Sequence, residues 1–183
     1  MSKQYDNPFM QYIETGQIDF SAGHLKLFNQ SMVMFPTTTY VNFHKKCINL
    51  GEKGKKLIFD IGWEQVKTVF SKFDKDYKIT KMDAERFTQL FAPTIKTCGW
   101  GDVRFEQIKL DKGQETIVII NNNPFAYIYK KILGIQKERV DDYLLGLFAA
   151  GIYAISGKKV AAKETKCIAK GDKHCEFIIK IKT

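Results

Sequence analysis

The feature that most constrains this chain is an uncharged run over residues 143–157, YLLGLFAAGIYAISG. The run is apolar on nearly every helical face, so a helix formed here must be buried on all sides. It is shorter than the ~20 residues needed to cross a bilayer, and its glycines and alanines suit close packing. We therefore expect a helix from about residue 138 to residue 156, running through the middle of a domain and ended by Gly157.

Other helices are predicted from apolar residues that recur at three- and four-residue steps. Three stretches have this period: the one that follows Pro36, residues 57–73 and residues 87–95. Pro93 is expected to kink or shorten the third helix, because proline lacks a backbone N–H. Asn123, followed by proline, predicts the start of a short helix that ends at Gly134.

Strands are predicted where apolar residues alternate. They cover residues 24–35, which we take as the first strand of the sheet, the hairpin of residues 103–110 and 115–120, and the strands on either side of the turn at residues 170–172. The apolar phase slips between Phe105 and Ile108, as one bulged residue would cause. The predicted fold class is α+β, an antiparallel sheet packed on helices.

Length and composition limit the classes of protein to consider. We expect one domain over residues 23–183 after an N-terminal extension of residues 1–22, and, without a secretory signal, a cytoplasmic location. The net charge of +9 comes from lysines scattered in pairs, which does not favour nucleic-acid binding. No catalytic motif is present, so we do not expect an enzyme.

The C-terminal hairpin carries the residues with the clearest chemistry. Its turn brings Cys175 back towards Cys167 and Glu164, so three potential metal ligands converge. Zinc prefers thiolates with a few nitrogen or oxygen ligands, and a fully ligated site of this type is structural. The alternative is a strand pair with two half-buried thiols and no metal.

The segment ETKCIAKGDKHCEF, residues 164–177, resembles the C-terminal signature of the 4-vinyl reductase domain family. The apolar, glycine-containing helix before it fits the same family, and the resemblance covers residues 121–181. The family is similar in fold to the small subunits of the TRAPP vesicle-tethering complex. It includes the sensory domains of bacterial activators that respond to aromatic hydrocarbons.

The resemblance implies one structural zinc per chain, held by Glu164, Cys167, Cys175 and a cysteine near the start of the central helix. At that fourth position this sequence has Asp141. The fourth ligand is then Asp141, a group supplied by His44 and Cys47, or water. For His44 and Cys47 the simpler interpretation is a helix with a half-exposed histidine and a core cysteine.

Aromatic residues are expected to fill the core, but the resemblance implies that some surround a cavity for an apolar ligand between the central helix and the sheet. We predict this lining to include Trp100, Phe105, Ile120 and Phe148. Cys98 is either a reactive thiol or, as we prefer, a buried or turn cysteine.

The leading functional hypothesis is a zinc-stabilised sensor or regulatory domain that binds a small hydrophobic molecule and forms a homodimer. The alternative is a dimerising scaffold of TRAPP-like fold without a ligand. A third interpretation, an enzyme or enzyme accessory, follows from the family name and has no cofactor motif to support it.

Overall fold

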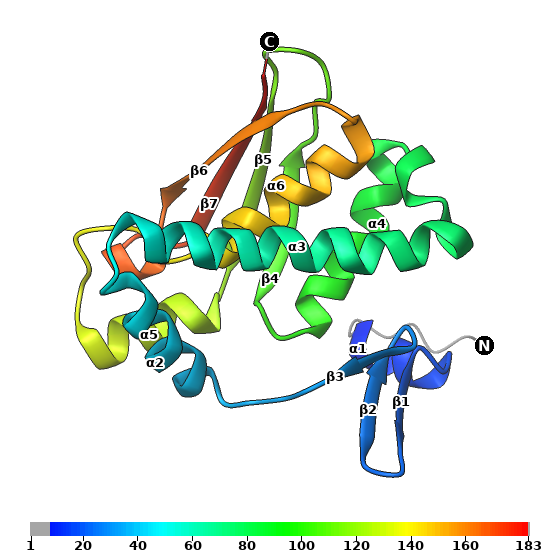
Figure 1. The fold of residues 1–183 in the computed structure, drawn as a ribbon, viewed down its shortest axis with the longest axis horizontal. Coiled ribbons are helices and arrows are strands. Elements are labelled where there is room, and N and C mark those ends of the chain that lie inside the picture. The colour runs from blue at the N-terminus through cyan, green and yellow to red at the C-terminus, as the bar shows by residue number, and fades with distance from the viewer. Residues whose placement is uncertain (1–7, 183) are drawn as a thin grey trace.

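The computed structural model describes residues 8–182, so residues 1–7 of the expected extension lie outside it (Figure 1). An antiparallel sheet has the strand order β4-β5-β7-β6. Its strands are β4 (Asp102–Gln107), β5 (Glu115–Asn121), β6 (Val160–Lys166) and β7 (Cys175–Ile181). The helices are α1 (Pro8–Glu14), α2 (Thr37–Ile48), α3 (Glu52–Tyr77), α4 (Ala84–Thr97), α5 (Pro124–Leu133) and α6 (Asp142–Ser156), with 3₁₀ turns η1 (Ile79–Lys81) and η2 (Ile168–Lys170). The predicted α+β fold class is confirmed.

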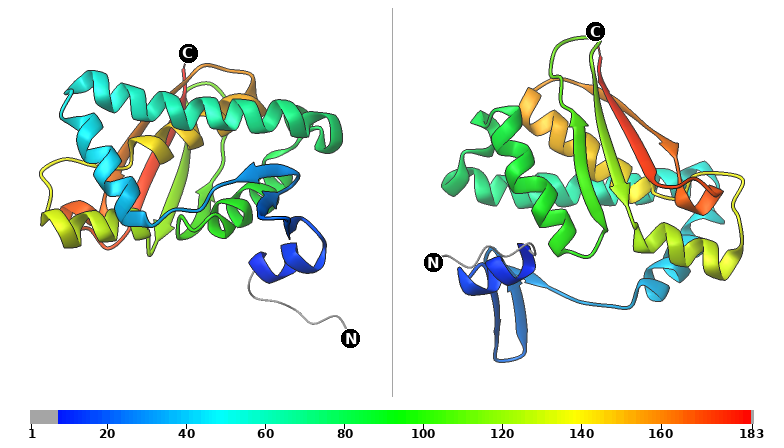
Figure 2. Two further views of the ribbon diagram at one scale, coloured as in Figure 1. Left: turned by 60° about the horizontal axis from the view of Figure 1, so that its bottom comes forward. Right: turned by 180° about the vertical axis from the view of Figure 1, so that it is seen from behind.

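Helix α6 lies in the middle of the molecule, as its composition predicted. It packs between α3 and the sheet, and all its residues from Asp142 to Ile152 are buried (Figure 1). The view from behind shows the opposite face of the sheet turned outward (Figure 2). No helix among the described residues is long and apolar enough to span a membrane.

Two glycines let α3 and α6 pack backbone against backbone. A Cβ atom added at Gly62 would lie 2.1 Å from the Tyr143 carbonyl oxygen, and one added at Gly146 would lie 2.0 Å from the Phe59 carbonyl oxygen. Both distances are far below any real contact. Glycine is therefore required at these two positions by the closeness of the helices.

Several local predictions are confirmed. The β4–β5 pairing shifts register between Phe105 and Gln107, at the predicted bulge. The Asn123 side chain caps α5 by accepting from the Ala126 N–H, and Gly134 ends that helix. Pro93 does not shorten α4, which continues to Thr97, so that part of the prediction is wrong.

The strand predicted over residues 24–35 is wrong in two respects. It is a hairpin of β2 (His24–Leu27) and β3 (Gln30–Met32), and it pairs with β1 (Ile18–Ser21) in a separate three-stranded sheet. Phe28 and Asn29 form the turn with positive φ angles of 49° and 60°. Phenylalanine is rare in such a turn, so the sequence carried no strong turn signal. We call α1 and β1–β3 the N-terminal unit; the expected boundary after residue 22 falls in its β1–β2 turn.

Candidate metal centre and ligand cavity

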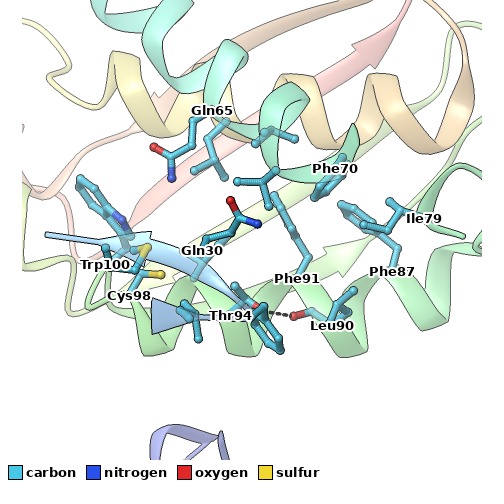
Figure 3. A pocket seen from close by; sticks show the side chains of 17 residues that line it. Gln30, Gln65, Phe70, Ile79, Phe87, Leu90, Phe91, Thr94, Cys98 and Trp100 are labelled. Carbon is cyan, nitrogen blue, oxygen red and sulfur yellow. Dashed lines mark hydrogen bonds between the residues drawn. The ribbon is translucent and has the colours of Figure 1, made fainter. Parts of the chain in front are cut away.

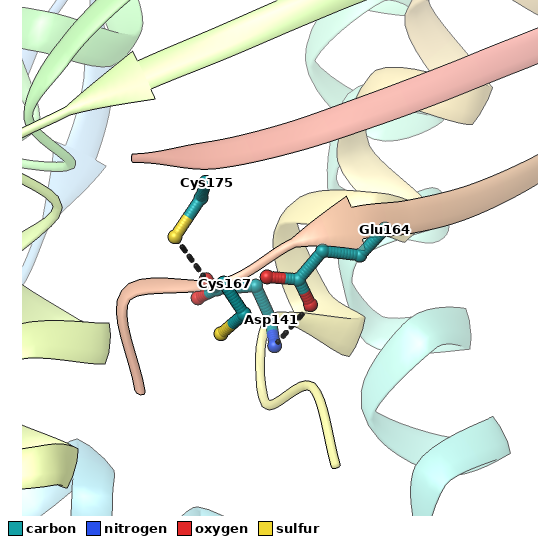
Figure 4. A group of neighbouring side chains, drawn as sticks. All are labelled: Asp141, Glu164, Cys167 and Cys175. Atoms are coloured by element: carbon teal, nitrogen blue, oxygen red, sulfur yellow. Dashed lines mark hydrogen bonds between the residues drawn. The ribbon is translucent and has the colours of Figure 1, made fainter. Parts of the chain in front are cut away.

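The four residues predicted as metal ligands meet in one buried group (Figure 4). Asp141, Glu164, Cys167 and Cys175 each offer one ligand atom, and these atoms all lie within 4.8 Å of one another. We call these four residues the metal group. Asp141 comes from the start of α6, and the other three come from β6, β7 and the turn between them.

A bulge in β6 brings Glu164 and Cys167 to the same side of the sheet. Residues three apart on a regular strand point to opposite faces. The pairing of β6 with β7 shifts register between Glu164 and Lys166, and the extra residue restores a common side for Glu164 and Cys167. Beyond the strand, the Cys167 N–H donates to Asp172 Oδ2 at 2.8 Å, which holds the turn around the thiol.

Asp141 is positioned by hydrogen bonds from three directions. Its Oδ2 atom accepts from Asn123 Nδ2 at 3.0 Å and from the Cys175 thiol at 3.2 Å, and its N–H donates to Glu164 Oε2 at 3.2 Å. Asp141 has non-helical backbone angles, φ −97° and ψ 42°, and α6 begins at Asp142, four residues later than predicted. Asn123 was predicted as a helix cap alone, and its second contact depends on the tertiary fold.

The carboxyl groups of the metal group are not fully satisfied within the protein. Asp141 Oδ1 and Glu164 Oε1 are buried and have no hydrogen-bond partner among the described residues. Burial, followed by repulsion from Cys167, raises the pKa of Asp141 to about 8. Burial, followed by repulsion from Asp141, raises the pKa of Glu164 to about 12. A bound cation would remove this repulsion and pair both free oxygens.

The two thiols complete a donor set that suits zinc. Hydrogen bonding with the Cys175 thiol lowers the pKa of Cys167 to about 6, and the same contact, with burial, raises the pKa of Cys175. Two thiolates and two carboxylates can form a four-ligand zinc site, so the residues fit the metal implied by the resemblance.

His44 and Cys47 do not belong to the metal group. Both are buried in α2. The imidazole ring of His44 packs edge-on against Phe125 and Tyr129, at centroid distances of 5.2 and 5.3 Å. The structure thus places Asp141, and neither of these two residues, beside Glu164, Cys167 and Cys175. The expectation that His44 is half-exposed is wrong, because α5 covers it.

The metal group can be reached from the surface through a polar pocket of about 290 Å³. Glu164 and Cys167 line it, together with Lys55, Arg139 and Lys170.

A second space, which we call the inner cavity, has a volume of about 100 Å³ and lies among α3, α4, α6 and the β2–β3 hairpin. Figure 3 shows Phe70 and Phe87 at one end and Trp100 and Cys98 at the other. Among the described residues, no charged side chain lines it. Cys98 lies in the turn that follows α4, and its side chain is exposed.

Two amide side chains add polarity to the inner cavity. Gln65 Oε1 accepts a hydrogen bond from the Tyr143 hydroxyl, and Gln30 Oε1 accepts from Lys72 Nζ at 2.9 Å. With their oxygens engaged, both amides keep N–H groups for a further acceptor. Neither glutamine was predicted as a site residue, because no motif marks it.

Of the four residues predicted to line a ligand pocket, Trp100 lines the inner cavity. Ile120 and Phe148 are instead buried core residues, and Phe105 packs half-buried against them. The ring of Phe148 contacts those of Phe105 and Phe177 at centroid distances of 6.2 and 5.1 Å, so side chains fill the space between α6 and the sheet there. The inner cavity lies on the other side of α6, against α3 and α4.

Comparisons with known proteins agree with this fold. No protein-family model matches the chain. An uncharacterised protein of Methanocaldococcus jannaschii is 26% identical over 125 residues, which are 68% of this chain and 64% of that protein. The match therefore spans less than two thirds of the relative.

Three solved structures share the fold. The phenol-responsive sensory domain of the transcription activator PoxR, determined with phenol, has a TM-score of 0.79 at 15% identity, covering 99% of this chain and 92% of that one. A vinyl-4-reductase family protein from Methanocaldococcus jannaschii has a TM-score of 0.55 at 16% identity, covering 83% and 85%. A trafficking protein particle complex subunit 3 from Naegleria fowleri, covalently bound to palmitic acid, has a TM-score of 0.55 at 14% identity, covering 80% and 93%. The predicted structural relationships are confirmed.

Proposed function

We propose that this chain is a zinc-stabilised sensor or regulatory domain that binds a small, uncharged aromatic molecule in the inner cavity. The observation that carries the proposal is a cavity of about 100 Å³ bordered by phenylalanine rings and by no charged residue. An engineered apolar cavity of about 150 Å³ in another protein binds benzene. The inner cavity is smaller but has the same apolar character, which supports a ligand no larger than a single ring at this place.

The polar end of the inner cavity supports a ligand that carries one oxygen. The free amide N–H groups of Gln65 and the indole N–H of Trp100 are donors, so an oxygen acceptor on the ring would pair with them. Phenol, the molecule bound by the PoxR domain of similar fold, meets this requirement. Binding would favour one packing of the N-terminal unit against α3 and α4 and pass that change to a partner or a dimer interface.

Calorimetric titration tests the ligand proposal. Phenol should bind and benzoate should not, because benzoate would bring an uncompensated charge into the cavity. Leu90→Trp, which fills the inner cavity, should abolish phenol binding. The exposed Leu50→Trp is the matched control and should leave binding intact. Equal binding of benzoate and phenol, or phenol binding unchanged by Leu90→Trp, would contradict the proposal.

We propose that the metal group holds one zinc per chain and that this zinc stabilises the fold. Cys167→Ser and Cys175→Ser should each lower the metal content and the thermal midpoint, because metal binding and folding are coupled. Cys98→Ser, which lies outside the metal group, is the control and should keep the metal. Native mass spectrometry before and after a chelator measures the metal. Unchanged metal and stability in both variants would reject the zinc site.

A dimerising scaffold is the second candidate function. Val33, Met34 and Phe35 follow the N-terminal unit, and 82%, 79% and 57% of their surfaces are exposed. Consecutive exposed apolar side chains commonly mark contact surfaces, which supports a homodimer for either function. A dimer in native mass spectra without any phenol binding would favour the scaffold.

A further inference from the structure

A second apolar space, the outer chamber, adjoins the inner cavity. It has a volume of about 510 Å³ and lies between the N-terminal unit, residues 33–36 and the body of the domain. Its lining includes Leu25, Met34, Thr37 and Phe125. As in the inner cavity, none of the described residues in its lining is charged, although 27% of the chain is charged. Both spaces therefore suit an uncharged ligand.

The same side chains form the wall between the two spaces. Leu27, Met32, Gln65, Cys98 and Trp100 line both the inner cavity and the outer chamber. The spaces are thus separated by no more than these side chains. Ligand pockets commonly measure roughly 300–1,000 Å³, a range that the inner cavity alone does not reach and the two spaces together do. A ligand that occupied both spaces would extend beyond the single ring that the inner cavity admits.

The position of the donors determines the order of groups along such a ligand. Phe70 and Phe87 are at the far end of the inner cavity, whereas Gln65 and Trp100 are at the wall that borders the outer chamber (Figure 3). A ligand that enters both spaces would place its ring deepest, an acceptor oxygen at the wall and an apolar group beyond it. An alkyl chain is the group that a large apolar chamber without charged residues favours.

We propose that the ligand is an uncharged molecule in which an aromatic ring is joined through an oxygen-bearing group, a ketone, ester or ether, to an alkyl chain. The ring occupies the inner cavity, the oxygen accepts from Gln65 and Trp100, and the chain fills the outer chamber. This inference rests on the proposed function, because the ring site is the inner cavity.

Binding of a homologous series of alkyl phenyl ketones tests the inference. Acetophenone, butyrophenone and hexanophenone carry the same ring and carbonyl with lengthening chains. Burial of each added methylene should tighten Kd by up to about fourfold, so hexanophenone should bind at least about tenfold more tightly than acetophenone. Calorimetric titration of the full chain measures each Kd.

Two neighbouring threonines supply a matched pair of variants. Thr37 lines the outer chamber, whereas Thr38 is exposed and does not line it. Thr37→Trp should remove the affinity that the longer alkyl chain of hexanophenone adds and leave acetophenone binding unchanged. Thr38→Trp should change neither. If the alkyl chain still adds affinity in Thr37→Trp, its placement in the outer chamber is wrong.

The remaining outcomes separate this inference from the function on which it rests. Binding of phenol and acetophenone without a gain from the longer chains would overturn the inference and leave the proposed function in place. In that case, a second copy of the protein becomes the better occupant of the outer chamber. Failure of phenol and of every ketone to bind would refute both.

Discussion

Asn123 joins a helix cap to the metal group. Its Oδ1 atom caps α5 by accepting from the Ala126 N–H at 3.2 Å, while its Nδ2 atom donates to Asp141 Oδ2 at 3.0 Å. Residues that hold metal ligands in place typically change metal affinity by 10–100-fold when they are replaced. The position therefore serves both helix stability and the proposed zinc.

Substitutions at Asn123 should separate these two roles. Asn123→Ser keeps a capping oxygen but is too short to reach Asp141, so zinc affinity should fall by roughly 10–100-fold with little loss of helix stability. Asn123→Ala should lose the same zinc affinity, and it should also lose about 1 kcal/mol of unfolding free energy because the helix cap is removed. Competition with a zinc indicator and urea unfolding of the metal-free protein measure the two effects. Full zinc affinity in Asn123→Ser would show that the contact with Asp141 does not matter.

The buried His44 should make the free energy of unfolding depend on pH. Burial lowers the pKa of His44 from 6.5 to about 4, so between these values the unfolded chain binds a proton that the folded protein does not. Stability should fall by about 3 kcal/mol as the pH drops from 6.5 to 4 and should be unaffected by His44 above 6.5. His44→Leu should remove this part of the pH dependence, measured by denaturant unfolding.

The exposed His24 provides the control for this measurement. His24→Gln should keep the slope of the wild-type protein, because that side chain is on the surface of β2. The metal group titrates in all three proteins, so the difference between His44→Leu and wild type isolates the buried histidine. Identical slopes in the two would mean that His44 is solvated.

At the scale of elements, the crossing of α3 and α6 should tolerate no added side-chain atom. Gly62→Ala and Gly146→Ala would each place a Cβ atom about 2 Å from a carbonyl oxygen of the facing helix. Overpacking typically costs 1–3 kcal/mol, and backbone cannot move aside as a side chain can, so we expect about 3 kcal/mol or more. Urea unfolding of each variant measures the loss.

Gly151→Ala is the matched control on the same helix. Its Cβ atom would meet only side-chain atoms, the nearest being Phe87 Cζ at 3.0 Å. Those rings can shift, and alanine favours the helix by about 1 kcal/mol over glycine, so the net change should stay within about 1 kcal/mol. Similar losses at Gly146 and Gly151 would argue against backbone contact between α3 and α6.

Most elements followed from local pattern, and the exceptions have physical causes. The spacing of apolar residues predicted the helices α2 to α6 and the strand pairs β4–β5 and β6–β7. This spacing is informative because each of these helices and strands buries one face, except α6, which buries all its faces. The β2–β3 hairpin was missed because its turn uses Phe28 in place of a residue that readily adopts positive φ. The start of α6 was misplaced because Asp141, which contacts Glu164 23 positions away in the sequence, has non-helical backbone angles.

At the scale of the whole molecule, ligand binding should tie the N-terminal unit to the body. Leu27, Gln30 and Met32 form one wall of the inner cavity, while α3 and α4 form the others. Saturating phenol should therefore slow hydrogen exchange in β2 and β3 and leave β5 and β7 nearly unchanged, because these central strands are already protected. Mass spectrometry of peptic peptides measures both regions. No change in β2–β3 would mean that the ligand does not contact the N-terminal unit.

The sequence by itself determined the fold class, the buried central helix and three residues of the metal group, Glu164, Cys167 and Cys175. Those conclusions rest on periodicity and on a compact motif, which are local properties. Only the tertiary structure decided that Asp141 joins Glu164, Cys167 and Cys175 while His44 and Cys47 do not, and that a bulge in β6 aligns the ligands. It also revealed the inner cavity beside α3 and α4, which we propose as the ligand site in place of the sheet side of α6. Cavities arise where side chains from distant segments leave space unfilled. The position of such a space cannot be predicted from a local sequence pattern.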